Sequence, residues 1–162
     1  MTFTHVLARE QFIPRPIEEV FEFFAEAGNL EVITPEFLNF RIVTPRPIDM
    51  AAGALIDYRL RLFGLPLRWR TRIEAFEPCS RFVDVQARGP YRLWRHTHEF
   101  RAASDGTLMT DRVEYQIAFG PIGGLAHAIF VRRTLNRIFD HRARVIERIF
   151  PSPPAKAGVV TS

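Results

Sequence analysis

Two of the five histidines of this chain stand two residues apart, in the stretch WRHTHEF at residues 94–100. In a β-strand, successive side chains alternate between the two faces of the sheet. The residues on one face would then be Trp94, His96, His98 and Phe100. Two imidazoles between aromatic rings could bind a metal ion, transfer protons, form the polar floor of a ligand pocket, or satisfy one another within a core.

A second segment, TDRVEY, adds a carboxylate and a phenol to this face. The Ser-Asp-Gly turn at residues 104–106 would pair the two segments as an antiparallel hairpin. With Ser and Asp at the tip of the turn, His98 lies opposite Asp111. With the tip one residue later, Tyr115 lies beside His96. In both registers the shared face is the more apolar one, so we expect it to line a cavity.

A carboxylate close to an imidazole orients the ring and raises its pKa, which suits a general acid or base near neutral pH. We therefore single out two pairs as catalytic candidates, His98 with Asp111 and His96 with Tyr115. The same groups could instead orient a ligand, or could only satisfy one another's hydrogen bonds inside a partly polar core. The sequence leaves these three interpretations open.

A metal site is a further alternative for the histidine pair. The His-x-His spacing directs both imidazoles to one side of a strand, and Asp111 could supply a third ligand. The sequence places neither Cys79 nor the other three histidines to complete such a site. We therefore expect no metal ion and no other cofactor.

Turn signals divide residues 38–119 into six segments with period-two alternation, which is typical of an antiparallel meander. A further strand is predicted at residues 3–12, and two short helices follow it. The first helix, within PRPIEEVFEFFAEAGN, has acidic residues in its first turn and is expected to end at Gly28. The second is expected to run from Leu30 to Ile33, with Asn29 as its cap.

After GPIGG, at residues 120–124, the apolar period becomes that of a helix and continues to about Phe150. We interpret GPIGG as a loop that could act as a hinge at a pocket mouth. The apolar stripe of the helix is formed by Leu125, Ile129, Leu135, Ile138, Phe139, Val145, Ile146 and Ile149. A helix of this length can lie across a whole sheet. Because a seven-stranded sheet curls, it should wrap around the helix and leave a cavity between them.

The 162 residues are enough for a single core, and 47% of them are hydrophobic. We predict one domain over residues 1–150 and a flexible, proline-rich tail over residues 151–162. The single cysteine, Cys79, excludes an intrachain disulfide and fits a reducing cytoplasm. No apolar run suits a secretory signal or a membrane span.

The positive charges are almost all arginines, and the formal net charge is +4. The arginines form two bands, one on two strands (Arg59, Arg61, Arg68, Arg70 and Arg72) and one on the long helix (Arg133, Arg137, Arg144 and Arg148). A solvated outer face explains both bands, and weak contact with an anionic membrane is the alternative. We find no nucleic-acid recognition motif and expect no nucleic-acid partner. The sequence does not distinguish a monomer from a homodimer.

The chain resembles the bacterial SRPBCC proteins of the START-like, polyketide cyclase/dehydrase superfamily. The resemblance covers about residues 3–150 and is carried by IPRPIEEVFEFF, NLEVITP, FVDVQARGPYRLWRHTHEF and GTLMTDRVEYQIAFGPIGG. It implies an α+β helix-grip fold, in which a seven-stranded curved antiparallel sheet wraps a long C-terminal helix around a deep pocket. It also implies binding of a lipid, sterol, quinone, polyketide or plant hormone. A minority of the superfamily are cyclases, dehydratases or hydrolases, and most members hold no metal.

The resemblance favours turning Phe82, Asp84 and Gln86 toward the pocket, although a simple core interpretation of this strand puts its valines inward. The ligand-binding candidates are therefore Trp69, Asp84, Gln86, Trp94, His96, His98, Phe100, Asp111 and Tyr115. We expect the protein to bind a small hydrophobic or aromatic ligand, lipid-, polyketide- or quinone-like. The alternative is a cyclase or dehydratase in which His98, polarised by Asp111, moves a proton next to a carbonyl group.

Overall fold

The computed structural model describes residues 3–117 and 121–152. Its elements, in chain order, are β1 (His5–Ile13), α1 (Ile17–Ala25), α2 (Asn29–Ile33), the 3-10 helix η1 (Glu36–Leu38), β2 (Arg41–Ile42), β3 (Leu55–Leu62), β4 (Leu65–Glu77), β5 (Arg81–Arg88), β6 (Tyr91–Ala103), β7 (Gly106–Ile117) and α3 (Pro121–Ile149). The six strands predicted after the two short helices are all present.

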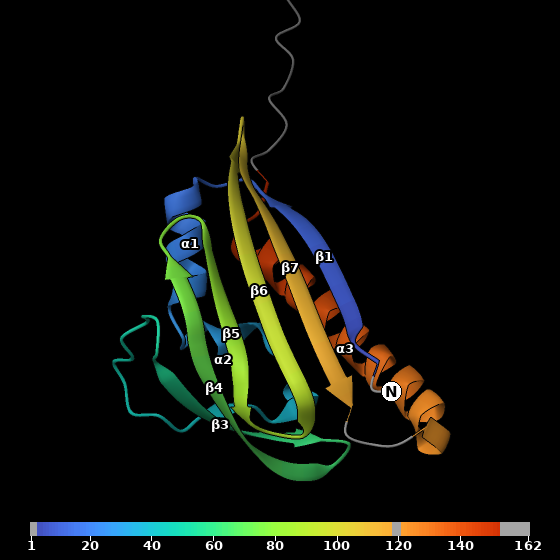
Figure 1. Ribbon diagram of the computed structural model, residues 1–162. Helices are drawn as coiled ribbons and strands as arrows, with labels where there is room; N and C mark the ends of the chain where they lie inside the picture. Colours follow the sequence, from blue (N-terminus) through green and yellow to red (C-terminus); the bar gives the residue numbers. More distant parts are fainter. Residues whose placement is uncertain (1–2, 118–120, 153–162) are drawn as a thin grey trace, which may run out of the picture.

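The strands form one antiparallel sheet in the order β1-β7-β6-β5-β4-β3-β2. Figure 1 shows that this sheet is twisted and curved. The helices α1, α2 and α3 all lie against its concave face, behind the sheet in this view. The predicted α+β helix-grip architecture is therefore confirmed.

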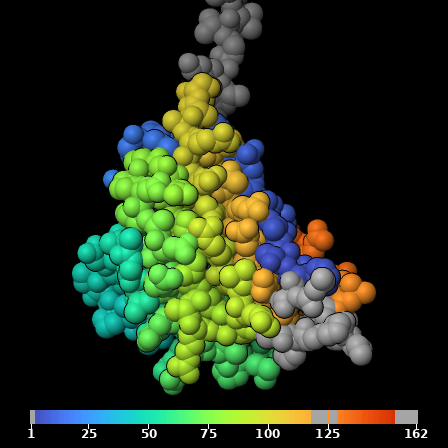
Figure 2. Space-filling view, in the orientation of Figure 1, coloured from blue at the N-terminus to red at the C-terminus, as the bar shows by residue number. Residues whose placement is uncertain are grey.

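The two faces of the sheet differ because buried and exposed residues alternate along the strands. In β4, Thr71 and Ile73 are buried, whereas Arg70 and Arg72 are exposed. Figure 2 shows the convex face, on which β4, β5 and β6 lie side by side. The predicted strand band of arginines lies on this face, on β3 and β4. Arg70 donates two hydrogen bonds to Asp57, at 2.7 and 2.9 Å. This band is thus an exposed face, in which Arg70 forms an ion pair with Asp57.

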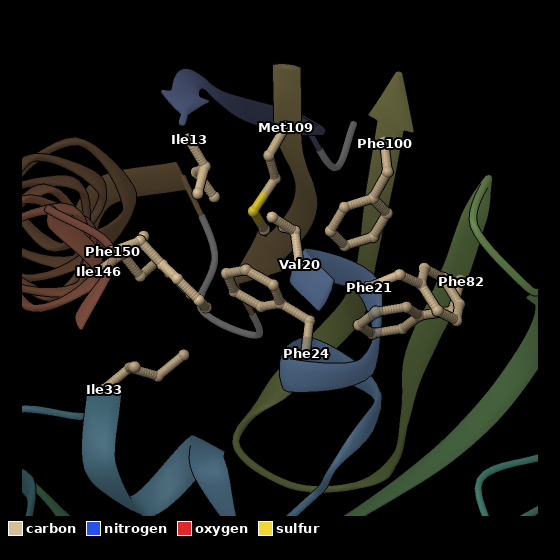
Figure 3. Close-up of a cluster of buried hydrophobic side chains, with 10 residues drawn as sticks. All are labelled: Ile13, Val20, Phe21, Phe24, Ile33, Phe82, Phe100, Met109, Ile146 and Phe150. Carbon is tan, nitrogen blue, oxygen red and sulfur yellow. The ribbon is translucent and has the colours of Figure 1, made fainter. Parts of the chain in front are cut away.

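A cluster of apolar side chains fills the space between the sheet and the C-terminal end of α3 (Figure 3). The helix α1 contributes Val20, Phe21 and Phe24, whose spacing places them on one side of the helix. The other members are Ile13, Ile33, Phe82, Phe100, Met109, Ile146 and Phe150. The cluster thus fixes α1 and the C-terminal end of α3 against the sheet.

The two short helices form where expected, and α2 ends at Ile33 as predicted, but the predicted caps of both helices are wrong. The helix α1 ends at Ala25, and Glu26, not Gly28, is its C-terminal cap. Asn29 is the first residue of α2 and does not cap it. Its side-chain amide donates instead to the carbonyl of Phe23, at 2.8 Å, and so ties α2 to α1.

The prediction for the start of the long helix is wrong in two respects. Gly123 and Gly124 lie inside α3 and not in a loop, while Gly120 lies outside the described residues. Leu125 and Ile129 are 74% and 59% exposed, although both belong to the predicted buried stripe. The first turns of α3 project at the lower right of Figure 1, where the sheet does not cover them. Farther along, Leu135, Phe139 and Ile146 of the stripe are buried, and Ile138, Val145 and Ile149 are half-buried.

No helix in residues 3–117 and 121–152 has the length and apolar character needed to cross a membrane. The predicted tail lies almost wholly outside these residues, so the domain boundary at residue 150 and the flexibility of residues 151–162 stay predictions.

Candidate functional site

Three neighbouring strands bring four titratable side chains together on the concave face. In the hairpin of β6 and β7, His98 lies opposite Asp111, which is the register predicted with Ser and Asp at the tip of the turn. On the other side of β6, Asp84 of β5 lies opposite His96. The two histidines are thus flanked by a carboxylate from each adjoining strand.

Asp111 contacts one ring nitrogen of each histidine. His96 Nε2 donates to Asp111 Oδ1, at 2.8 Å. His98 Nδ1 lies 2.9 Å from the same oxygen, but the angle is too poor for a hydrogen bond. Asp111 is therefore a shared partner for both imidazoles.

Asp84 contacts the two other ring nitrogens. His98 Nε2 donates to Asp84 Oδ2, at 2.9 Å, and His96 Nδ1 lies 3.6 Å from that oxygen. Because His96 uses Nε2–H toward Asp111, its Nδ1 is left with a lone pair on the side of Asp84. Each imidazole thus stands between two carboxylates.

Aromatic packing fixes the two imidazole rings. Their centroids lie 3.7 Å apart. Phe82 stacks on His98 with centroids 4.1 Å apart, and Phe139 of α3 meets His96 edge to face at 5.5 Å. Rings held in this way keep their donor atoms in a fixed direction.

Arg142 of α3 completes the cluster, and we did not predict it. Its side chain is only 9% exposed, its Nη2 lies 3.9 Å from Asp111 Oδ1, and its Nε has no hydrogen-bond partner. The guanidinium also lies over the rings of Phe24 and Phe139. The available signal was its spacing: Arg142 follows Phe139 by three residues and precedes Ile146 by four, so it falls on the apolar stripe.

The surroundings move the pKa values of the two histidines in opposite directions. Burial would lower the pKa of His98, but Asp111 and Asp84 together raise it above the ordinary value of 6.5. Burial and the neighbouring charge of His98 lower the pKa of His96 below 6.5, against the opposing effect of Asp111. His98 is therefore the proton-holding member of the pair.

Both carboxyl groups stay ionised. Burial would raise the pKa of Asp111, but the charge of Arg142 and the two histidines hold it well below 3.8. Burial would likewise raise the pKa of Asp84, and its hydrogen bond from His98 is the largest of the effects that lower it. The cluster thus holds two carboxylates, one guanidinium and one readily protonated imidazole.

A cavity of about 200 Å³ lies beside this cluster, between the sheet and α3. Its polar lining at this wall consists of Asp84, His96, His98 and Arg142. Most of the remaining lining is aliphatic or aromatic, from the helices, β3, β4 and β6. Both tryptophans of the chain line the cavity, with ring centroids 5.3 Å apart, and Trp69 Nε1 donates to Thr71 Oγ1. The cavity is therefore mainly apolar, with this polar wall and a second polar margin of Glu26, Asn29 and Thr34 around α1 and α2.

Five of the nine predicted ligand-binding residues line this cavity, namely Trp69, Asp84, Trp94, His96 and His98. On β5, Phe82 and Asp84 face the cavity, as the resemblance favours, although Val83 is also fully buried. Asp111 lies behind the histidines and lines a second, smaller cavity between β1, β7 and α3. Its connection to the main cavity is through the two imidazoles and Arg142, all of which it contacts.

The other three predicted residues are not in the lining of the main cavity. The Gln86 side chain forms hydrogen bonds with the backbone of Tyr91. Phe100 packs in the cluster under α1. Tyr115 is buried, stacks on His5 and lies opposite Trp94, so its predicted pairing with His96 is wrong.

A group of exposed apolar side chains lies where the tip of the β3–β4 hairpin approaches α3. Phe63 and Phe130 are in contact across this junction, with ring centroids 4.4 Å apart. Leu65, Leu125 and Ile129 are exposed on the same two elements. We call these five residues the apolar tip. The cavity lining includes Leu62, next to Phe63, so the apolar tip begins where that wall of the cavity ends.

The chain matches the model of a family described as polyketide cyclase / dehydrase and lipid transport over residues 13–140. It belongs to this family. No curated protein sequence matches the chain.

The fold is also that of several solved structures. The protein TTHA0849 from Thermus thermophilus is 18% identical with a TM-score of 0.70, and the match covers 89% of this chain and 95% of that one. The major latex-like protein 151 from Panax ginseng is 12% identical with a TM-score of 0.64, covering 92% and 99%. A nucleoside-diphosphate sugar epimerase from Corynebacterium glutamicum is 27% identical with a TM-score of 0.66. That match covers 88% of this chain but only 28% of the epimerase.

Proposed function

We propose that the protein binds a small hydrophobic or aromatic ligand, lipid-, polyketide- or quinone-like, in the cavity between the sheet and α3. The observation that carries this proposal is the contrast between an apolar lining and one wall of convergent polar groups. Ligand pockets combine a largely apolar surface with a few fixed polar contacts. The body of the ligand would lie against Trp69 and Trp94, and its polar group would face His98, Asp84 and Arg142.

The two tryptophans make this proposal testable without a label, since the chain has no others. A titration with 1,4-naphthoquinone, a long-chain fatty acid and an anthraquinone should give saturable quenching of tryptophan fluorescence for at least one compound. Leu60→Phe, which places extra volume in the cavity lining, should abolish that response. Leu65→Phe is the matched control, because this side chain is 65% exposed at the hairpin. Equal responses in both variants would contradict binding in this cavity.

The second candidate is an enzyme of the cyclase or dehydratase type. It is favoured by one observation, the position of His98 between two carboxylates with its pKa raised. Such an imidazole can act as a general acid toward a group in the cavity. The guanidinium of Arg142, which lines the cavity and has an unpartnered Nε, would support developing negative charge.

Replacement of His98 separates the two functions. In an enzyme, His98→Ala should abolish turnover and leave ligand affinity within about tenfold. In a binding protein the same variant should lose affinity, and no compound that binds should be converted. Product analysis by mass spectrometry of the bound compounds distinguishes the two outcomes.

We also propose weak contact with an anionic membrane, from which a hydrophobic ligand could be taken up. The supporting observation is the apolar tip next to the cavity lining, with the exposed Arg61 and Arg133 close in sequence. Exposed apolar side chains flanked by cations are suited to an anionic lipid surface. A cytoplasmic location, the absence of a nucleic-acid partner, and a monomer or homodimer remain proposals of the same kind.

A further inference from the structure

The histidine pair and Asp84 turn three donor atoms toward one point at the cavity wall. One donor atom from each of Asp84, His96 and His98 lies within 4.8 Å of the other two. Asp84 Oδ2 is 2.9 Å from His98 Nε2 and 3.6 Å from His96 Nδ1. Donors around a tetrahedral zinc ion at roughly 2.1 Å stand about 3.4 Å apart. The two separations from Asp84 bracket this value and the third lies within 4.8 Å, so side-chain shifts of roughly an ångström would bring the three donors onto one ion.

Asp111 holds the opposite ring nitrogens of the same two histidines. It accepts from His96 Nε2 at 2.8 Å and lies 2.9 Å from His98 Nδ1. Metal-ligating histidines characteristically direct their second nitrogen to a carboxylate, which fixes the tautomer and the direction of the ring. A hydrogen-bonded core histidine needs no such arrangement of both nitrogens on both rings. The stacked Phe82 adds to this fixed geometry.

The charge of the cluster also suits a cation. With both imidazoles neutral, Asp84 and Asp111 contribute two negative charges and Arg142 contributes one positive charge. The net charge of −1 favours a cation at this point, and a divalent ion bound to two neutral imidazoles would bring the cluster to +1. The ligand atoms then lie on the cavity side, which leaves coordination positions open toward a bound molecule.

We propose that Asp84, His96 and His98 form a binding site for a divalent first-row transition-metal ion such as Zn²⁺, with Asp111 positioning both imidazoles from behind. This site replaces our expectation from the sequence in two ways: a metal ion is bound, and the third ligand is Asp84 and not Asp111. The inference goes beyond the proposed function, because the ion can be detected without knowing the hydrophobic ligand.

The test uses the full chain without an affinity tag, treated with a chelator and then titrated with ZnCl₂ by calorimetry. Co²⁺ serves as a second probe, because its visible absorption bands report the number and geometry of its ligands. We expect one ion per chain. Asp84→Asn, which removes a ligand charge at nearly constant volume, should weaken Zn²⁺ binding beyond the roughly 10- to 100-fold typical of outer partners. Asp111→Asn should weaken it within that range.

The matched control is His5→Gln, which removes a histidine that lies on β1 and outside the cluster. Its Zn²⁺ affinity should equal that of the unmodified chain, and circular dichroism of each variant confirms the fold. Failure of both Zn²⁺ and Co²⁺ to bind saturably, or binding that Asp84→Asn leaves unchanged, would overturn the site. The tryptophan titration, carried out on chelator-treated protein, tests ligand binding separately, so failure of one proposal does not imply failure of the other.

Discussion

At the scale of single residues, the candidate site gives two chemically identical side chains different properties. His96 and His98 share a strand face, yet the pKa of one is lowered and that of the other is raised. The two pKa values differ because Asp111 and Asp84 stabilise the protonated form of His98 more than that of His96. A protonated His98 also repels a second positive charge on His96.

This difference can be measured directly by NMR titration of the imidazole nitrogens. We expect His98 to titrate above 6.5 and His96 below it. In Asp111→Asn the pKa of His98 should fall, because one of the two carboxylates that raise it has become neutral. The resonances of His5 provide an internal comparison. Titration of His98 below 6.5 in the unmodified chain would contradict the described arrangement.

Asp111 also links the stability of the fold to pH. Asp111→Asn should destabilise the fold by about 3–5 kcal/mol near neutral pH, because the buried Arg142 loses the carboxylate with which it pairs. A raised pKa of His98 stabilises the native state most at pH values below 6.5, the value in the unfolded chain. The variant loses part of this stabilisation, so its deficit in unfolding free energy should widen as pH falls from about 8 to about 5. A lowered pKa of Asp111 stabilises the native state at pH values above the pKa of this group in the unfolded chain. The difference in unfolding free energy between the two proteins should therefore narrow below a pH of about 4.

Urea unfolding of the unmodified chain and of Asp111→Asn across this pH range provides the measurement. A difference in unfolding free energy that is the same at all pH values would show that the charge of Asp111 does not affect protonation in the cluster.

The residues of the site could be predicted from the sequence only in part, for identifiable reasons. Period-two alternation and the Ser-Asp-Gly turn place His98 and Asp111 on one face and narrow their pairing to two registers, of which the structure adopts the one that puts them opposite each other. They do not say what covers each part of a curved face. Phe100 and Trp94 share the face of β6, but Phe100 lies under α1 while Trp94 lines the cavity. We did not predict Arg142, because an apolar helix stripe that is defined by hydrophobicity does not include charged residues.

At the scale of elements, α3 performs two different tasks along its length. From Val131 onward it packs against the sheet and supplies Arg142, while Leu125, Ile129 and Phe130 before this point are exposed. The apolar period of the sequence continues through both parts. Periodicity therefore predicts the helix correctly but does not reveal where the sheet beneath it ends.

A pair of substitutions tests this division. Ile146→Ala should lower the free energy of unfolding by about 2–5 kcal/mol, because the side chain is fully buried and leaves a cavity. Leu125→Ala, on the same helix, should change it by less than about 0.5 kcal/mol because the residue is exposed. Chemical denaturation gives both values, and comparable losses would mean that the first turns of α3 are packed.

At the scale of the whole molecule, the fold separates a charged outer face from an apolar interior, with the apolar tip beside one wall of the cavity. If the protein contacts membranes, the apolar tip and the adjoining arginines should mediate the contact. Binding to phosphatidylglycerol-rich vesicles should then occur at low salt and weaken steeply at high salt, because ion screening reduces the attraction.

Phe130→Ser, in the apolar tip, should reduce this vesicle binding several-fold. Phe12→Ser is the control, since Phe12 is about equally exposed but lies on β1. Sedimentation with vesicles measures both variants. Absence of binding at low salt would remove the membrane contact from the proposed function, whereas equal losses in the two variants would only exclude the apolar tip as its location.

The most direct measurement of the central claim is native mass spectrometry of the chain after incubation with a lipid and quinone extract and repurification. Occupancy of the cavity predicts a complex with one small molecule, which disappears on denaturation. It also predicts that the complex is retained in Leu65→Phe and lost in Leu60→Phe. A chain that keeps no small molecule, or that keeps it equally in Leu60→Phe, would contradict the proposal that this cavity is a ligand-binding site.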